Sequence, residues 1–303
     1  MNDTETVYDA LDQAHGGEGQ WAFGTGFDDP LAGVDTTVPD GVDAADLGAY
    51  CLMLGDDALV LSQRLTEWAT RSPELEEEVA VANCALDLLG QARLLLGRAG
   101  TCGVLGRSRS LATESIPDED ALAYFRAPDE FRNHVLVEVD GGDFAQTMVR
   151  LLIASAYRLA VFTRLRDSRD PVLSAIAAKG VHELTYHRDY AARWVLRLGD
   201  GTAESHRRAA VAVDALWPLL ADLFTATEVE TRLTGAGVAV DPGGFEVEVR
   251  EVLGTVLTRA TLDAPEWPVA RPSPGRAGSH TPELAPLLAE LQGLAREHPA
   301  ATW

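Results

Sequence analysis

The sequence has little positive charge, and this scarcity argues against one class of partner. Its 303 residues include 25 lysines and arginines against 47 aspartates and glutamates, for a formal net charge of -22. Phosphate backbones attract basic patches, so nucleic-acid binding is not expected. Lys179 is the only lysine. A saline cytoplasm and a GC-rich genome account equally well for this composition.

Cysteines and long apolar runs are also scarce. The three cysteines, Cys51, Cys84 and Cys102, have the spacing of neither a metal site nor a disulfide framework. No run of about 18 or more apolar residues occurs, so no membrane span is expected. The first residues are acidic, whereas a secretory signal begins with basic ones. We therefore expect a soluble protein of the reducing cytoplasm.

The N-terminal segment 1–46 differs in composition from the rest of the chain. It contains eleven acidic residues and no basic one. It has no sustained hydrophobic periodicity, so it cannot bury enough apolar surface to fold by itself. We expect residues 1–46 to be a disordered leader and residues 47–303 to form one helical domain. Trp21, Phe23 and Phe27 are the side chains with which the leader would dock onto a surface.

From Leu47 onward, apolar residues recur at three- and four-residue steps, the spacing of amphipathic helices. Ser72 and Pro73 precede several glutamates and form a helix start signal, and Asp170-Pro171 forms another. Strand-like alternation is limited to a weak run at 135–139. The fold class expected is all-α, a bundle of at least four long helices. The predicted helices span 47–69, 72–98, 144–166, 170–198, 203–225, 244–262 and 282–297, with a short helical piece within 118–125.

The stretch KGVHELTYHRDY (179–190) resembles part of a metal site. Glu183 precedes Tyr186 and His187 by one helical turn. Di-iron carboxylate bundles use a Glu-x-x-His pair on each of two helices and one further glutamate on each of the other two. The carboxylates bridge the two irons and balance their charge, so the number of acidic ligands decides whether such a site can form.

The other helices supply too few ligands. The first offers Glu67, and the second offers Asp87 with Gly90 where a ligand histidine would stand. Helix 144–166 contains no acidic residue. With Glu183 and His187, the chain provides three carboxylates and one imidazole, which is fewer than a di-iron bundle requires. We therefore expect no metal and no catalytic residue in this chain.

The lysine offers a reason for the missing metal. Lys179, Glu183 and His187 follow one another at steps of four residues and so share one stripe of a helix. If this stripe faces inward, the ammonium group of Lys179 lies among Glu67, Asp87 and Glu183 in place of a metal. Buried carboxylates are costly unless paired, which favours an internal cation.

Two alternatives to an internal lysine are open. Arg150 or Arg158 of helix 144–166 could be the internal cation in its place. A simpler interpretation is an exposed pair between Lys179 and Glu183, which stabilises a helix by only about 0.3–0.5 kcal/mol. The position of Lys179 and its rarity in the chain favour the internal cation.

A few other polar residues have weaker assignments. Asp56 and Asp57 lie nearer the start of the first helix than Glu67 does. We expect His134 and Glu138 to have a surface role, because the segment that contains them has no clear pattern. His182 is turned about 100° from Glu183 on the same helix, so we expect it at the surface or at an interface.

Several stretches resemble the C-subunit family of the bacterial phenylacetyl-CoA epoxidase complex. The similarity extends over residues 49–303, and the block around LDLLGQAR is its most specific part. The stretches that carry it are LGDDALVLSQRLTEW (54–68), PELEEEVAVANCALDLLGQAR (73–93), VFTRLRDSRDP (161–171), AKGVHELTYH (178–187) and GSHTPELAPLLAELQGL (278–294). The leader lies outside this pattern.

The resemblance implies a ferritin-like helical fold with additional C-terminal helices and a heteromeric partnership. In such complexes, a related A subunit holds the di-iron centre and epoxidises the aromatic ring of phenylacetyl-CoA. A reductase with flavin and an iron–sulfur centre brings electrons from NADPH, and small accessory subunits complete the complex. The C subunit resembles the A subunit in fold but has no working metal site. The resemblance also suggests that Lys179, Glu183 and His187 are a family feature.

The expected function is therefore that of a non-catalytic structural subunit of a phenylacetyl-CoA mono-oxygenase. It would pair with the di-iron A subunit and stabilise it. The alternative is a catalytically active di-iron oxygenase, or a ferroxidase, with an atypical ligand set. A free-standing helical binding protein is a third possibility, which would expose no large apolar patch.

Overall fold

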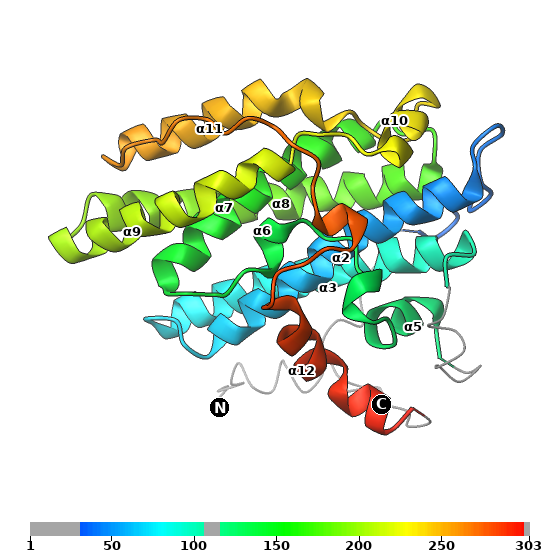
Figure 1. Cartoon of the computed structure of the whole chain (residues 1–303), viewed down its shortest axis with the longest axis horizontal. Helices are drawn as coiled ribbons and strands as arrows, with labels where there is room; N and C mark the ends of the chain where they lie inside the picture. Colours follow the sequence, from blue (N-terminus) through cyan, green and yellow to red (C-terminus); the bar gives the residue numbers. More distant parts are fainter. Residues whose placement is uncertain (1–30, 106–115, 300–303) are drawn as a thin grey trace, which may run out of the picture. The chain divides into compact units, whose positions relative to one another are not determined.

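The computed structural model describes residues 31–105 and 116–299 of the chain. Helices and connecting loops account for this part, with no strand in it, so the all-α prediction is confirmed. Four long helices form a ferritin-like bundle: α2 (Ala44–Ala69), α3 (Leu75–Thr101), α7 (Phe144–Leu165) and α8 (Pro171–Gly199) (Figure 1). α2 packs against α3, α7 packs against α8, and contacts between α3 and α8 link the two pairs.

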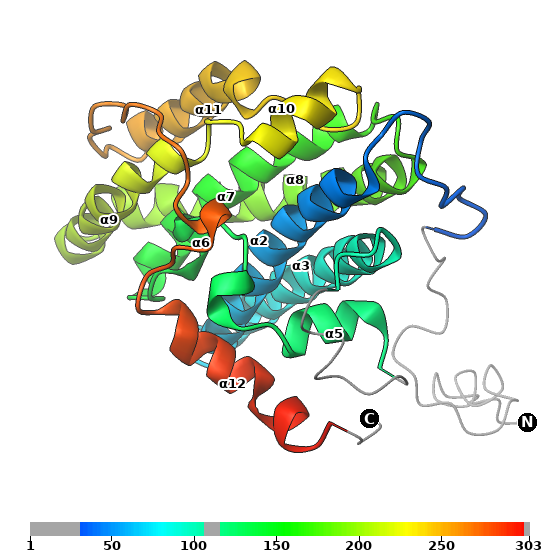
Figure 2. The same ribbon diagram turned by 45° about the vertical axis from the view of Figure 1, so that its right-hand side comes forward.

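Shorter helices pack around this bundle (Figure 2). α9 (Ala203–Leu216) and α11 (Glu246–Arg259) contact α7 and α8, and α10 (Glu228–Gly235) contacts α2. α12 (Leu284–Glu297) lies against α5 (Asp118–Tyr124). The remaining helical pieces are short: α6 (Val135–Glu138) and the 3₁₀ helices η1 (Pro128–Glu130), η2 (Trp217–Asp222), η3 (Pro242–Phe245) and η4 (Gly275–Ala277).

Three local expectations from the sequence are corrected. The weak strand run at 135–139 is the helical turn α6. The helix expected to run to residue 225 ends at Leu216, and η2 follows with a proline in its first turn. Proline has no backbone N–H to donate, which interrupts the α-helical bonding at this point. α3 begins at Leu75 because the Ser72 hydroxyl, instead of capping it, donates to the Trp68 carbonyl of the preceding helix at 3.0 Å.

The residues just before α2 contact the bundle. The compact unit that contains the bundle begins at Gly33, and the boundary that the sequence predicts between the leader and the helical domain is at residue 47. Within this unit, the Thr36 carbonyl accepts a hydrogen bond from Arg98 of α3 at 2.5 Å. The Asp46 carboxylate pairs with Arg232 of α10 at 2.7 Å. These contacts tie the end of the predicted leader to the bundle. Residues 1–30, which contain the aromatic residues expected to dock, lie outside the described residues.

Two features fix the approach of α8 to its neighbours. A Cβ atom at Gly180 would lie 2.6 Å from the ring of Phe162, so glycine at this position allows α7 and α8 to pack closely. Asp170 caps α8 by accepting a hydrogen bond from the Leu173 amide at 2.9 Å, as the sequence predicted. The second carboxylate oxygen of Asp170 pairs with Arg98 of α3, and both side chains are buried. The start of α8 is thereby attached to the end of α3.

One helix in the described part of the chain, α3, is long and apolar enough to cross a membrane by length and composition alone. Core helices of soluble proteins pass the same test. Of the most apolar 18-residue stretch of α3, 44% is buried inside the protein. α3 therefore has an apolar side that its own bundle does not cover.

Replacing Asp170 tests the joint between α3 and α8. Asp170→Ala removes the cap and leaves the buried Arg98 guanidinium without its anion, so we expect a loss of about 3–5 kcal/mol in the free energy of unfolding. Urea denaturation measures this loss. Asp167→Ala, at an exposed position on the same turn, is the control. Equal stability of the two variants would contradict the assigned role of the pair.

Candidate functional site

Lys179 lies at the surface of the bundle. Its side chain is 40% exposed, and its Nζ atom is 3.3 Å from Oε1 of Glu183. The prediction that Lys179 replaces a metal inside the bundle is therefore wrong. The simpler alternative, an exposed pair at i,i+4, is the one that the structure contains.

The geometry of an α-helix explains this error. Each step of four residues turns about 40° further around the helix axis, so residues at i, i+4 and i+8 gradually change direction. Along α8, the side chain of Lys179 is 40% exposed, that of Glu183 is 14% exposed and that of His187 is fully buried. The stripe passes from solvent into the core within two turns.

The internal cation is Arg158 of α7, one of the two arginines named as alternatives. Its side chain is buried, and it donates to the Leu54 carbonyl of α2 at 3.1 Å and to Oε1 of Gln91 at 2.9 Å. The amide nitrogen of Gln91, on α3, donates to Oε2 of Glu183 on α8 at 2.9 Å. One hydrogen-bonded chain thus connects all four helices of the bundle.

Arg158 keeps its charge in this position. Burial lowers the pKa of Arg158 to about 10, while the nearby Asp57 carboxylate acts in the opposite direction. A pKa of about 10 leaves the guanidinium protonated at neutral pH. The other candidate, Arg150, is also buried, but it donates to the carbonyls of Val139 and Asp140 in the loop between α6 and α7. Arg158 is therefore the cation that contacts the predicted ligand helices.

Two of the other predicted residues contact each other. The Nε2 atom of His187 is 3.0 Å from Oδ2 of Asp87, which joins α8 to α3. His187 is fully buried, whereas the Asp87 side chain is 38% exposed. The buried imidazole of His187 is therefore hydrogen-bonded to a carboxylate that lies partly at the surface of the bundle.

Glu67, the remaining predicted residue, belongs to a different part of the protein. Its carboxylate pairs with Arg64, one turn earlier on α2, at 3.0 Å. Arg64 in turn donates to the carbonyls of Glu138 and Glu283. Glu67 thus helps to hold the end of α2 against α6 and the start of α12. The five predicted residues do not form one cluster.

The described residues of the bundle do not fit a di-iron centre. No group of three or more His, Cys, Asp or Glu side chains in residues 31–105 and 116–299 is arranged to hold a metal ion. The buried guanidinium of Arg158 would also repel a divalent cation, and this repulsion is strong where water is excluded. The donors that remain, Asp87, Glu183 and His187, are engaged in hydrogen bonds within the protein.

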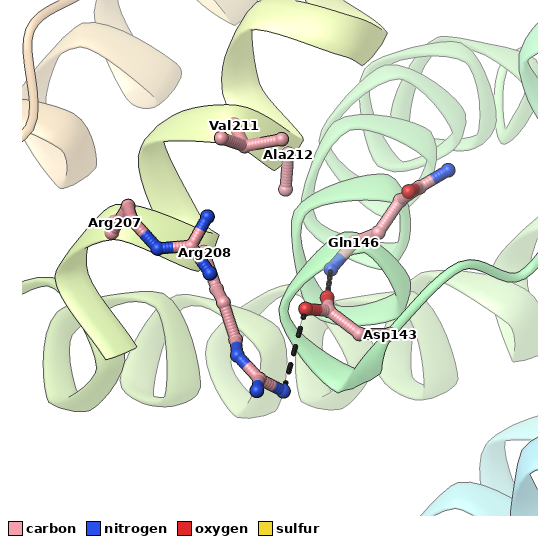
Figure 3. Close-up of a pocket in the computed structure, with 6 residues that line it drawn as sticks. All are labelled: Asp143, Gln146, Arg207, Arg208, Val211 and Ala212. Atoms are coloured by element: carbon pink, nitrogen blue, oxygen red, sulfur yellow. Dashed lines mark hydrogen bonds and ion pairs between the residues drawn. The ribbon is translucent and has the colours of Figure 1, made fainter. Parts of the chain in front are cut away.

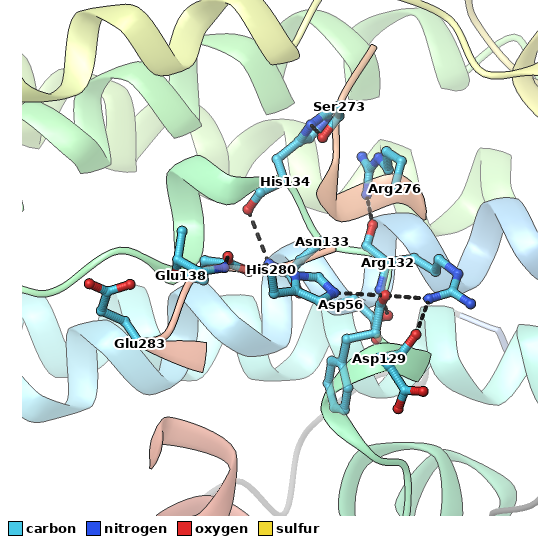
Figure 4. A network of polar contacts seen from close by, with 12 residues as sticks. Asp56, Asp129, Arg132, Asn133, His134, Glu138, Ser273, Arg276, His280 and Glu283 are labelled. Atoms are coloured by element: carbon cyan, nitrogen blue, oxygen red, sulfur yellow. Dashed lines mark hydrogen bonds and ion pairs between the residues drawn. The ribbon is translucent and has the colours of Figure 1, made fainter. Parts of the chain in front are cut away.

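A second buried network, which the sequence did not reveal, lies between α2 and the C-terminal segment (Figure 4). Asp57 pairs with Arg276 of η4 at 2.7 Å, and both side chains are about 3% exposed. Asp56, also fully buried, pairs with Arg126 and accepts a hydrogen bond from the Arg132 amide at 2.8 Å. The sequence feature that could have predicted this network is the pair of adjacent aspartates, Asp56 and Asp57, inside an apolar helical run. Acidic residues that are buried in such a run need partners inside the protein.

His134 and Glu138 belong to the same network, so the prediction of a surface role for them is wrong. Both side chains are buried. The Glu138 carboxylate lies 2.7 Å from Nδ1 of His280, and Nδ1 of His134 is 3.2 Å from the Ser273 hydroxyl. The segment that contains His134 and Glu138 has no hydrophobic periodicity because polar contacts hold its loops in place, and not because it is exposed. His182, by contrast, is exposed as predicted.

A surface pocket of about 250 Å³ lies between the start of α7 and α9 (Figure 3). Arg207 and Arg208 line it, and Arg208 is 3.9 Å from Asp143 on the opposite side. Both arginines also pair with Glu204, and these hydrogen bonds lower the pKa of Glu204 to about 2. Because the charges are already neutralised within the protein, this pocket offers no free anion site.

Comparison with known proteins supplies the family. The family model described as "Phenylacetic acid catabolic protein" matches residues 34–303. The chain belongs to this family. It is also 43% identical over 257 residues to the C subunit of 1,2-phenylacetyl-CoA epoxidase from Escherichia coli (strain K12), across 85% of this chain and 99% of that protein. The resemblance seen in the sequence is thus confirmed, and the matched part begins where the compact helical unit begins.

Two variants compare how much the surface residue Lys179 and the buried residue Arg158 each contribute to stability. Arg158→Met removes the donor for Oε1 of Gln91, and a buried acceptor left without a partner costs about 1–3 kcal/mol. Lys179→Met, at an exposed pair, is expected to change stability by about 0.5 kcal/mol or less. Chemical denaturation of both variants measures the difference. A larger loss for Lys179→Met would contradict the assignment of the internal cation.

The contact between His280 and Glu138 makes a contribution to stability that depends on pH. Burial acts to lower the pKa of His280, but the hydrogen bond to Glu138 and its negative charge act against this, and the net shift is upward. A raised folded pKa stabilises the protein below the unfolded value of about 6.5 and less as pH rises through the folded value. We therefore expect the stability difference between the natural protein and His280→Gln to shrink above neutral pH. Urea denaturation across a pH series measures it, and a difference independent of pH would contradict the pairing.

Proposed function

We propose that this chain is a non-catalytic structural subunit of a phenylacetyl-CoA epoxidase complex, which acts in aerobic phenylacetate degradation in the cytoplasm. The observation that supports this most directly is the chain from Arg158 through Gln91 to Glu183. These side chains link helices across the bundle, and di-iron bundles bind their metal through side chains that project into the bundle interior. A protein held together there by a guanidinium has a stable fold but no metal chemistry of its own.

The proposed partners are the other components of the complex. The main one is a homologous A subunit that contains the di-iron centre, and a reductase and small accessory subunits complete the assembly. Two bundles of the same fold present equivalent helix faces, so they can form a pseudo-symmetric pair. In this pair, the present chain would hold the helices of the catalytic partner in place. The similarity to a protein named as the C subunit of such an epoxidase supports this arrangement.

The alternative is a di-iron oxygenase or ferroxidase with an atypical ligand set. One observation favours it, because Asp87 and His187 are in contact and Glu183 lies one turn away on the same helix as His187. Metal binding at these residues would have to break the hydrogen bonds to Gln91 and displace the charge of Arg158. The structural role requires no such change.

Iron content distinguishes the two functions. We expect the chain purified alone from iron-rich medium to contain no stoichiometric iron. Co-purified with the A subunit, it should give iron and epoxidase activity in proportion to the A subunit. Metal analysis of both preparations, with the A subunit alone as a control, measures this. About two irons per chain in the isolated protein, the content of a di-iron bundle, would overturn the structural assignment.

A further inference from the structure

The solvent-facing side of α3 carries an apolar stripe. Leu75, Val79, Leu86 and Leu89 are exposed to 69%, 52%, 62% and 42% respectively. Together with Ala82, which is half-buried, they follow one another at alternating steps of four and three residues. This is the spacing of the seam along which two helices pack side by side. The opposite side of α3 already packs against α2 and α8.

A groove runs beside the second half of this stripe. It lies between α3 and α5 and has a volume of about 480 Å³. Leu59, Leu86, Leu89 and Leu96 are among its apolar lining residues, and Tyr124 lies on the α5 side. Tyr186 of α8 is another large exposed side chain, at 45%. The stripe and the groove together form the face that we call the α3 face.

Acidic residues border the α3 face. Glu76 and Glu78 accompany the first half of the stripe, and Glu119 and Asp120 line the groove. Arg93 is the single basic residue among those that line the groove, and it is 3.4 Å from Glu119. Burial and, to a lesser extent, the adjacent Glu119 carboxylate raise the pKa of Asp120, while Arg93 acts in the opposite direction. An apolar strip with acidic borders is complementary to an apolar strip with basic borders.

This charge pattern distinguishes the possible occupants of the face. A second copy of the chain would bring another acidic border, and each copy has a net charge of -22. Anionic membrane surfaces attract basic segments and would be repelled in the same way. A helix with leucine or aromatic residues on one side, flanked by lysines and arginines, satisfies both the apolar seam and the acidic borders.

We propose that the α3 face binds a helix of the partner subunit whose apolar ridge is flanked by lysine and arginine residues. This inference rests on the proposed function, since it assigns the surface through which the structural subunit holds its partner. Apolar side chains of that helix occupy the seam from Leu75 to Leu89 and the groove beside α5. Its basic residues pair with Glu76, Glu119 and Asp120.

A charge placed in the seam tests the proposal. Leu86→Glu puts a carboxylate at the centre of the contact, where it would be buried without a partner. We expect it to weaken binding of the intact chain to the purified A subunit by about tenfold or more, which corresponds to about 1.4 kcal/mol or more. Glu119→Lys with Asp120→Lys should also weaken binding, and more at low salt than at high salt. Isothermal titration calorimetry with the A subunit measures both effects.

Val247→Glu is the matched control, because Val247 is 65% exposed on α11, a different helix. If the natural chain binds the A subunit and Leu86→Glu binds as tightly as Val247→Glu, the α3 face is not the interface, but the proposed function stands. If the natural chain does not bind the A subunit at all, the proposed function fails with the inference. Self-association of the chain alone, or binding to vesicles with anionic lipid, that Leu86→Glu abolishes would overturn the choice of partner.

Discussion

The buried charge of Arg158 is the interaction around which the bundle is organised. Burying a guanidinium is costly unless its donors find partners. Here the two terminal nitrogens of Arg158 donate to the Leu54 carbonyl and to Gln91, and Gln91 in turn donates to Glu183. Each of the four long helices contributes one member, so the interior has one arrangement that satisfies it. In a di-iron bundle, metal ions balance the carboxylates that project into the interior.

Buried ion pairs occur elsewhere in the protein, both within the bundle and between the bundle and the segments packed on it. Three buried arginines, Arg98, Arg126 and Arg276, each pair with a buried aspartate. Arginine suits this use better than lysine, because its planar group presents several donors in a fixed geometry and remains charged when buried. The preference for arginine in the composition therefore has a structural counterpart inside the protein.

The long helices could be predicted from the sequence because hydrophobic periodicity and caps such as Asp170 act locally. The interior of the site could be predicted only in part. The poor ligand count was visible, and Arg158 could be named as an alternative, but the choice between it and Lys179 depended on a rotation of about 40° per step along α8. The network around Asp57 and Glu138 depends on partners far along the chain, and no local pattern specifies them.

The pairing of Asp57 with Arg276 spans 219 positions of the chain. During synthesis the N-terminal part emerges first, so α2 and α3 can form long before Arg276 exists. Until then, the Asp57 carboxylate lacks its ion-pair partner and has only the nearby charge of Arg158, so its burial is less favourable. The native surroundings of this α2 carboxylate are therefore complete only once the C-terminal segment is in place. A chain interrupted before η4 would keep the buried Asp57 but lose the guanidinium that pairs with it, so the C-terminal segment contributes to the packing of α2 although it is made last.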